Sequence, residues 1–316
     1  MKIKESISNN SSDGLVEDML KRPDALGKRG IDLFNEDGFE FVYGDGQANI
    51  GISKHGADIE GIPKNKCVLL KTEPPIYNIF FGLNIHKESF MKKYLAVMCD
   101  YVIDTFPVVR YNIPREFDLM ERYPSRYKTD FLCMILKNKS FGIFLNSLVP
   151  SLHKYKKYNL MNTRKEFDKI CCDKLKSDRY QSYGRGWDKR CFKGSLPKTG
   201  HLRIMSSHLF TLTTENSSLP GYVTEKMLYP MFCESIPIYL GAPDVEKYVP
   251  KGTFIDIRDF DKYEDVIDFI VNMQPKEIEQ YKKKIKKFVT SDQSYNFSSV
   301  TFAKKLVGIL EGDVKK

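Results

Sequence analysis

The chain has 316 residues, of which 41% are hydrophobic and 29% are charged, and this composition excludes a wholly disordered protein. Lysine and arginine (50) outnumber aspartate and glutamate (41), so the net charge is +9, which suggests nucleic acid, an anionic membrane or a phosphorylated small molecule as a partner. No apolar run is long enough to span a bilayer, and the first residues lack the apolar segment of a secretory signal. We therefore expect a cytoplasmic protein without a transmembrane segment.

Strands and helices are predicted to alternate along the chain. Residues 1–14 are expected to be mobile, because Ser6 to Gly14 is polar and rich in Gly, Ser and Asn. Runs of β-branched and aromatic residues then predict strands at Phe39–Tyr43, Cys67–Leu70, Tyr101–Thr105, Phe131–Leu136, Leu209–Thr213, Ile236–Leu240 and Thr253–Ile257. Longer patterns predict helices, for example at Glu166–Leu175, Glu225–Glu234 and Lys262–Met273. The alternation predicts an α/β architecture with mostly parallel sheets, and the length predicts two domains with a boundary near Tyr123–Lys128.

Three features of the sequence have ordinary explanations. The 7 cysteines include no C-x-x-C pair, which favours buried thiols over a zinc site. The basic run Lys282–Lys287 follows a helical pattern, and the solvated face of a packed helix explains it better than a nucleic-acid site, so no nucleic-acid partner is expected. Asp259-Phe260-Asp261 could hold a divalent cation, but it precedes an amphipathic run and is better explained as the start of a helix.

The segment 208–243 carries the chemistry. It predicts a strand, a polar loop from Thr214 to Tyr222, a helix that opens at Thr224, a second strand and a Gly-Ala-Pro turn. A helix that begins past the carboxyl end of a strand can bind nucleotide phosphates through its unpaired N–H groups and its dipole. Lys226 adds a positive charge and Glu225 an acceptor for sugar hydroxyls. Taken alone, Glu225 and Lys226 could equally be surface residues of the first helical turn.

The whole string is more specific than its parts. Glu215-Asn216-Ser217, Tyr222-Val223-Thr224-Glu225-Lys226 and the stretch Ile236–Ala242 resemble, in residues and spacing, the signature of the α-1,3-fucosyltransferases. The close resemblance covers about Leu202 to Asp259. Weaker similarities occur at Thr163–Phe167, Tyr183–Gly186 and Thr72–Pro75.

The resemblance implies a GT-B fold, in which two Rossmann-like domains face each other across a cleft. Residues 1–127 would then bind the acceptor sugar, and residues 128–316, including the C-terminal helices, would bind GDP-fucose. The reaction implied is inverting transfer of L-fucose to a glycan hydroxyl, with α-1,3 transfer to the GlcNAc of an N-acetyllactosamine-type acceptor as the family's expectation. Another nucleotide-sugar transferase of the GT-B type, or a basic nucleic-acid-binding α/β protein, remains as an alternative.

Residue roles follow from the same resemblance. The donor-binding residues would be Asn216, Tyr222, Glu225 and Lys226, and Arg164 would contact the diphosphate. Glu73 would be the general base, so that the catalytic set would be Glu73, Glu225 and Arg164. Two departures from the family pattern are Pro230, which should kink the helix, and a long stretch from Lys137 to Asn162.

The sequence also predicts a reaction without a metal or other cofactor. At an effective dielectric constant near 20, a cation about 4 Å from a phosphate charge contributes on the order of 4 kcal/mol. Arg164 and Lys226 could therefore replace a divalent ion at the leaving diphosphate. If Glu73 is not the base, Glu88 and Asp104 are the next candidates.

Overall fold

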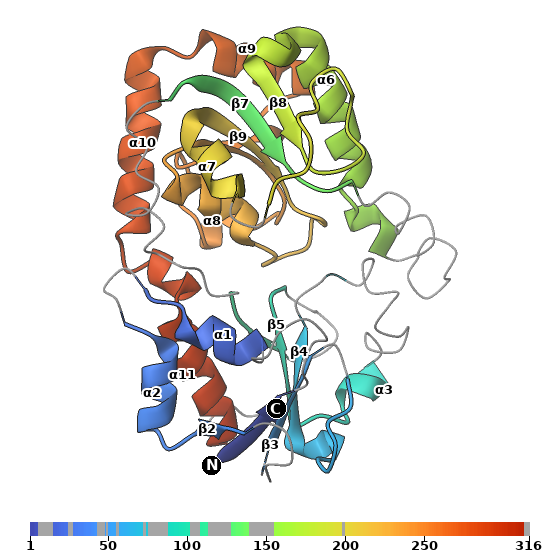
Figure 1. Cartoon of the computed structure of the whole chain (residues 1–316), viewed down its shortest axis with the longest axis vertical. Helices are drawn as coiled ribbons and strands as arrows, with labels where there is room; N and C mark the ends of the chain where they lie inside the picture. The colour runs from blue at the N-terminus through green and yellow to red at the C-terminus, as the bar shows by residue number, and fades with distance from the viewer. Residues whose placement is uncertain are drawn as a thin grey trace. The chain divides into compact units, whose positions relative to one another are not determined.

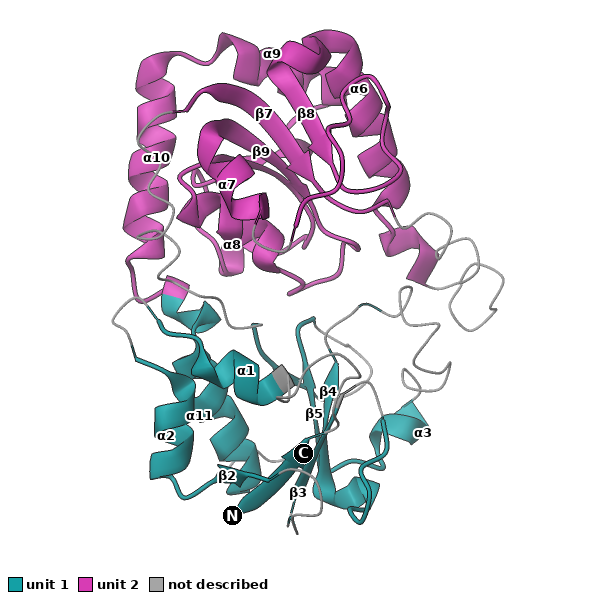
Figure 2. Ribbon diagram, viewed as in Figure 1, with its two compact units in different colours: residues 1–118, 149–154, 295–316 teal, residues 119–148, 155–294 magenta. Residues whose placement is uncertain are grey.

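Two compact units make up the chain. The computed structural model describes residues 1–5, 15–24, 28–42, 48, 50–54, 57–71, 74, 88–101, 108–112, 128–138, 155–197 and 200–312. Unit 1 comprises residues 1–118, 149–154 and 295–316, and unit 2 comprises residues 119–148 and 155–294 (Figure 2). Each unit is built on its own parallel sheet (Figure 1), which confirms the predicted α/β architecture.

The sheet of unit 1 has the strand order β2-β1-β3-β4-β5-β6, and every neighbouring pair is parallel. Its strands are β1 (Lys2–Glu5), β2 (Glu40–Phe41), β3 (Ile50–Lys54), β4 (Cys67–Lys71), β5 (Ala96–Cys99) and β6 (Val109–Arg110). All five residues of β4 are buried, as expected of an inner parallel strand whose two faces are covered. The predicted strand at Cys67–Leu70 is therefore confirmed.

Two predictions for unit 1 are wrong. Residues 2–5 are not mobile but form β1, because the side chain of Ile3 is fully buried in the core and β1 pairs with both β2 and β3. The strand predicted to begin at Tyr101 lies earlier, since β5 pairs with β4 and ends at Cys99. Residues 6–14 and 102–105 lie outside the described residues.

The last helix of the chain belongs to unit 1, although the sequence assigned residues 295–316 to the C-terminal domain. The helices of unit 1 are α1 (Leu15–Lys21), α2 (Gly30–Glu36), α3 (Glu88–Met91) and α11 (Ser299–Leu310), with the short turn η1 (Lys64–Lys66). Phe302, Leu306 and Leu310 of α11 join the apolar core that contains Ile3. A side chain on Gly30 would place its Cβ 2.3 Å from the carbonyl oxygen of Ser299, so glycine permits α2 and α11 to approach closely.

The sheet of unit 2 has the order β11-β10-β9-β7-β8, again with parallel neighbours. Its strands are β7 (Asp130–Ile135), β8 (Tyr180–Tyr183), β9 (His208–Thr214), β10 (Ile236–Leu240) and β11 (Ile255–Asp256). Its helices are α6 (Met161–Arg179), α7 (Gly200–Ser207), α8 (Glu225–Phe232), α9 (Tyr263–Asn272) and α10 (Pro275–Val289). The shorter 3-10 turns are η5 (Val245–Lys247), η6 (Ile257–Asp259) and η7 (Ser294–Phe297), which begins at the last residue of unit 2.

The predicted strands and helices around residues 131–136, 209–213, 225–234, 236–240 and 262–273 are confirmed to within a few residues. α8 continues through Pro230 to Phe232, so the proline does not interrupt the helix. The helical geometry of α6 is broken at Lys176, which has φ 57°. The regular part of α6 therefore ends at Leu175, as predicted.

Two polar side chains tie unit 2 together. The indole N–H of Trp187, the one tryptophan of the chain, donates to the carbonyl of Leu136 at 2.6 Å. The ammonium of Lys128 donates to the carbonyls of Ser206 (2.9 Å) and Cys233 (2.8 Å), at the carboxyl ends of α7 and α8. Burial lowers the pKa of Lys128 to about 8. The 7 cysteines are all buried and free of disulfide bonds.

Among the helices described, none combines the length and the apolar character that crossing a membrane requires.

Candidate functional site

Buried polar residues gather at the carboxyl ends of β9 and β10 in unit 2. β9 ends at Thr214, and the side chains of Thr214, Glu215 and Asn216 are all at most 4% exposed. The backbone N–H of Glu215 donates to the carbonyl of Leu240, the last residue of β10, at 2.8 Å. Ligands of parallel α/β sheets bind at this edge, where loops follow the strands. The buried polar residues therefore mark a candidate site.

Arg164 anchors the loop that follows β9. It lies in the first turns of α6 and is 1% exposed. Its Nε donates to the hydroxyl of Thr214 at 2.6 Å, and its Nη2 donates to the carbonyl of Thr214 at 2.6 Å and to Oδ1 of Asn216 at 2.9 Å. The structure thus brings two predicted site residues, Arg164 and Asn216, into direct contact. These hydrogen bonds from the guanidinium hold the end of β9 and the start of the loop in place. Arg164 therefore positions the loop, whether or not it also contacts a phosphate.

Glu215 is the member of this cluster to which the sequence reasoning gave no role. Its carboxylate is fully buried, accepts hydrogen bonds from the backbone N–H and the hydroxyl of Thr224 at 2.8 and 2.9 Å, and lies 3.3 Å from the ammonium of Lys226. Burial raises the pKa of Glu215, while Lys226 and the Thr224 hydrogen bonds act in the opposite direction. The signal in the sequence was its place directly after a strand, nine residues before the Thr224 cap.

The N-terminus of α8 differs from the prediction in one respect. Thr224 is the N-cap, as its sequence context allows, and its hydroxyl accepts from the backbone N–H of Lys226. The N–H groups of Thr224 and Lys226 are therefore both engaged within the chain, rather than presented to a phosphate. The anion at this helix N-terminus is the carboxylate of Glu215, which complements the helix dipole.

Lys226 and Glu225 lie where the cluster meets solvent. The ammonium of Lys226 is 3.1 Å from the hydroxyl of Thr224 and 3.3 Å from a carboxylate oxygen of Glu225. The Lys226 side chain is 16% exposed and that of Glu225 is 36% exposed. Both can therefore reach a bound molecule, whereas Glu215 cannot.

Tyr222, the remaining predicted donor residue in this loop, is buried in the turn before α8. Gly221 beside it has a positive φ of 76°, and its N–H donates to the carboxylate of Asp244 at 2.7 Å. The turn is thus fastened to the segment that follows β10.

The Gly-Ala-Pro turn after β10 forms a tight wall beside Glu215. A Cβ on Gly241 would lie 2.1 Å from the phenol oxygen of Tyr239 and 2.5 Å from Cγ of Glu215, so only glycine fits. The phenol of Tyr239 accepts from the N–H of Ala242 at 3.1 Å, and the hydroxyl of Ser218 donates to the carbonyl of Gly241 at 2.9 Å.

A pocket of about 440 Å³ opens at the end of β10. Leu240, whose carbonyl accepts from Glu215, lines it together with Arg258, Phe260, Asp261 and Tyr263. Its aromatic, cationic and carboxylate side chains can accommodate a flat polar ring. The pocket shares a strand end with the Glu215 cluster, so one ligand could extend over both.

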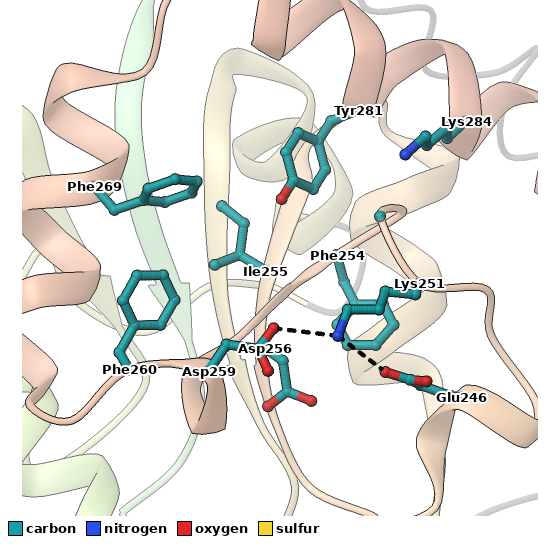
Figure 3. A pocket seen from close by; sticks show the side chains of 11 residues that line it. Glu246, Lys251, Phe254, Ile255, Asp256, Asp259, Phe260, Phe269, Tyr281 and Lys284 are labelled. Carbon is teal, nitrogen blue, oxygen red and sulfur yellow. Dashed lines mark ion pairs between the residues drawn. The ribbon is translucent and has the colours of Figure 1, made fainter.

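The two carboxylates of Asp259-Phe260-Asp261 line different pockets. Asp261 lines the pocket at the end of β10, while Asp259 lines a pocket of about 410 Å³ beside α10, where its carboxylate is 3.8 Å from the ammonium of Lys251 (Figure 3). α9 begins at Tyr263, two residues after this motif, as predicted. In the described part of the chain, no group of three or more His, Cys, Asp or Glu side chains could hold a metal ion.

The predicted general base, Glu73, lies outside the described residues, as does Asp104. Glu88 is the first residue of α3, and its carboxylate is 2.7 Å from the ammonium of Lys92 one turn later, with both side chains exposed. This is an ordinary surface pair on a helix.

The segment that holds these residues is similar to known proteins. Residues 153–306, which include Arg164 and the whole Glu215–Lys226 segment, match glycosyltransferase family 10 (fucosyltransferase), C-terminal domain. The α-(1,3)-fucosyltransferase FucT of Helicobacter pylori is 39% identical over 67 residues, which are 21% of this chain and 14% of that protein. The α-(1,4)-fucosyltransferase of Arabidopsis thaliana is 37% identical over 71 residues, 22% of this chain and 18% of that protein.

Solved structures extend the likeness to the whole chain. Crystal structures of α1,3-fucosyltransferase, alone and with GDP-fucose, have TM-scores of 0.57 and 0.51 at 13% and 15% identity, and cover 99% of this chain and 90% and 91% of theirs. These likenesses show the fold, which is that of the GT-B glycosyltransferases. The sequence matches span about a third or less of the curated relatives' length. Residues 153–306 are thus similar to the C-terminal domain of the glycosyltransferase family 10 fucosyltransferases, and the likeness of the remaining residues is one of fold.

Proposed function

We propose that the protein transfers L-fucose from GDP-fucose to a hydroxyl group of a glycan acceptor. The observation that carries this proposal is the cluster of Glu215, Thr224 and Lys226 at the end of β9, within the segment that matches the fucosyltransferase family. A solved α1,3-fucosyltransferase with the same fold was crystallised with GDP-fucose, which supports the choice of donor. The relatives include both α-(1,3) and α-(1,4) enzymes, and we propose α-1,3 transfer to an N-acetyllactosamine-type acceptor.

In this proposal the donor lies along the carboxyl ends of β9 and β10. Lys226, partly exposed, meets the negative charge that develops on the leaving diphosphate. Arg164, which is buried beneath the loop, adds positive charge and holds Asn216 in place. Glu225 accepts hydrogen bonds from the hydroxyl groups of the sugar, and the nucleoside occupies the pocket at the end of β10.

Transfer with inversion requires a base opposite the leaving group. We propose that Glu73 takes the proton from the acceptor hydroxyl. The oxygen of that hydroxyl then bonds to the anomeric carbon of fucose as the bond from this carbon to GDP breaks. Two cations, Arg164 and Lys226, then stabilise the departing GDP, and we propose that no divalent metal is required.

The direct test of the donor site uses labelled GDP-fucose with a panel of small glycans, followed by linkage analysis of the product. Lys226→Met should lower turnover on the order of 100-fold, whereas Lys174→Met, which removes an ion pair with Asp268 on the surface, should leave it unchanged. Similar turnover in both variants would contradict the donor assignment. Tighter binding of UDP-galactose or GDP-mannose than of GDP-fucose would favour another nucleotide-sugar transferase.

The test of the base is Glu73→Gln. This change keeps the size of the side chain but prevents it from taking a proton, so transfer should fall by roughly 100-fold to 10,000-fold while GDP-fucose affinity stays near that of the wild type. An active variant with an unchanged pH–rate profile would assign the base to another carboxylate.

A further inference from the structure

Glu215 is a buried carboxylate that cannot touch the donor, and it is paired with the lysine that we expect the donor to engage. We propose that Glu215 is a positioning residue that takes up a proton when the donor draws Lys226 away, so that donor binding is coupled to proton uptake. This inference rests on the proposed function and deepens it.

The geometry shows why Lys226 and Glu215 depend on each other. The Lys226 ammonium is 3.3 Å from Oε2 of Glu215 and 3.1 Å from the Thr224 hydroxyl, and it is the cation that opposes the burial of this carboxylate. A diphosphate at the mouth of the site attracts the same ammonium. Since the Lys226 side chain is 16% exposed, it can turn outward, whereas Glu215, at 0%, cannot follow.

The Glu215 side chain has little room to move on its Gly241 side when the ammonium leaves. Cγ of Glu215 lies within 2.5 Å of where a Cβ on Gly241 would stand, so the wall behind the carboxylate is closely packed. A buried carboxylate that loses its counter-charge is costly, and protonation is the response that requires least movement.

The cluster can hold Glu215 in either protonation state. Both carboxylate oxygens lie 2.9 Å from the hydroxyl of Thr224. That hydroxyl donates to the ionised carboxylate and can instead accept from the neutral carboxyl, while the Thr224 N–H donates to Oε1 in both cases. The added proton comes from bulk water through the opening that the partly exposed Lys226 leaves.

The other charged or titratable groups around Glu215 favour this response. Glu225 on α8 repels negative charge at Glu215. Tyr239 on β10 is buried against Glu215, which further raises the pKa of its phenol. Arg164 on α6 donates hydrogen bonds to Thr214, to Oδ1 of Asn216 and to the carbonyl of Lys137. With Lys226 turned outward, the nearest remaining charge on α8 is therefore negative.

The experiment is calorimetric titration of the full chain with GDP-fucose, at several pH values between 5 and 8, in pairs of buffers with different ionisation heats. GDP-fucose is used because its diphosphate is esterified at both ends and does not titrate near pH 6, as a terminal phosphate does. The wild type should take up between about 0.3 and 1 proton per donor bound. Its affinity for GDP-fucose should therefore fall by up to about tenfold for each unit by which the pH rises between 5 and 8.

Glu215→Gln should reduce the uptake to below about 0.1 proton. Lys226→Met is the second variant, in case Glu215→Gln folds poorly, and it should also abolish uptake because Glu215 is then without the ammonium before binding. Asp173→Asn, which alters an exposed ion pair with Arg190, is the matched control and should behave as the wild type. Undiminished uptake in Glu215→Gln, or none in the wild type, would overturn the inference alone. Absence of GDP-fucose binding at every pH would overturn the proposed function and this inference with it.

Discussion

Replacing Arg164 with lysine tests whether this residue acts by its charge or by its geometry. The wild-type guanidinium makes short hydrogen bonds to the hydroxyl and carbonyl of Thr214 and to Oδ1 of Asn216, at 2.6, 2.6 and 2.9 Å. A lysine keeps the positive charge, but its single ammonium nitrogen cannot reproduce the planar guanidinium, whose separate N–H groups donate to all three acceptors at once. If the lysine ammonium retains one of the three hydrogen bonds, the other two are lost. Two of the buried acceptor atoms on Thr214 and Asn216 are then left without a charged donor.

Each such loss costs about 1.5–3 kcal/mol, so the loss of two should lower the free energy of unfolding of unit 2 in Arg164→Lys by about 3–6 kcal/mol. For a unit of this size, 1 kcal/mol corresponds to about 2–4 °C in Tm, and the expected decrease is therefore about 6–24 °C. Trp187 lies in unit 2 and is the one tryptophan of the chain, so its fluorescence during urea unfolding reports on this unit.

The matched control is Arg190→Lys. Arg190 also makes several contacts with carboxylates, those of Asp188 and Asp173, but its side chain is 52% exposed. Exposed ion pairs contribute about 0–1 kcal/mol, so this variant should unfold almost as the wild type does. Equal, small effects in the two variants would refute the conclusion that Arg164 positions the loop, and would leave only a role for its charge.

Three further predictions concern packing, buried charge and metal. Gly241→Ala should destabilise unit 2 by about 1–3 kcal/mol, measured by urea unfolding, because the new Cβ collides with the phenol of Tyr239. Burial lowers the pKa of Lys128 from 10.5 to about 8, so between these pH values the unfolded chain binds more protons. Wild-type stability relative to Lys128→Met should therefore rise from pH 8 to 10.5, and a flat difference would contradict the pKa shift. Fucose transfer should persist in excess EDTA, whereas complete and reversible loss would return Asp259 and Asp261 to consideration as ligands.

The parts of the site that are local in sequence were predictable. Strand, loop, cap and helix follow one another between His208 and Phe232, and each has its own signal in the residues, such as Thr224 at the cap. The long inner strands were predictable for the same reason, because they are apolar runs bounded by polar residues. β1, β3, β6 and β8 were missed, since none of them is an unbroken apolar run and they gain their stability from neighbouring strands.

What the sequence did not predict depends on contacts between distant residues. Arg164 meets Thr214 across 50 positions, and its burial follows from that meeting rather than from any local pattern. The place of Glu215 after a strand indicates a loop residue at the edge of the sheet, but it does not predict the hydrogen bonds to Thr224 or the ion pair with Lys226. The amphipathic pattern of α11 shows that the helix packs on a core, but not on which of the two cores.

The position of α11 has a consequence for synthesis on the ribosome. Gly30 donates its N–H to the hydroxyl of Ser299, and the hydroxyl in turn donates to the carbonyl of Arg22, so the first helices and the last one share a hydrogen-bonded seam. Unit 2 has all its residues once position 294 has emerged, but the core of unit 1 still lacks Phe302 and Leu306. The core of unit 1, which contains the first strand of the chain, is therefore completed only when the residues of α11 have been added.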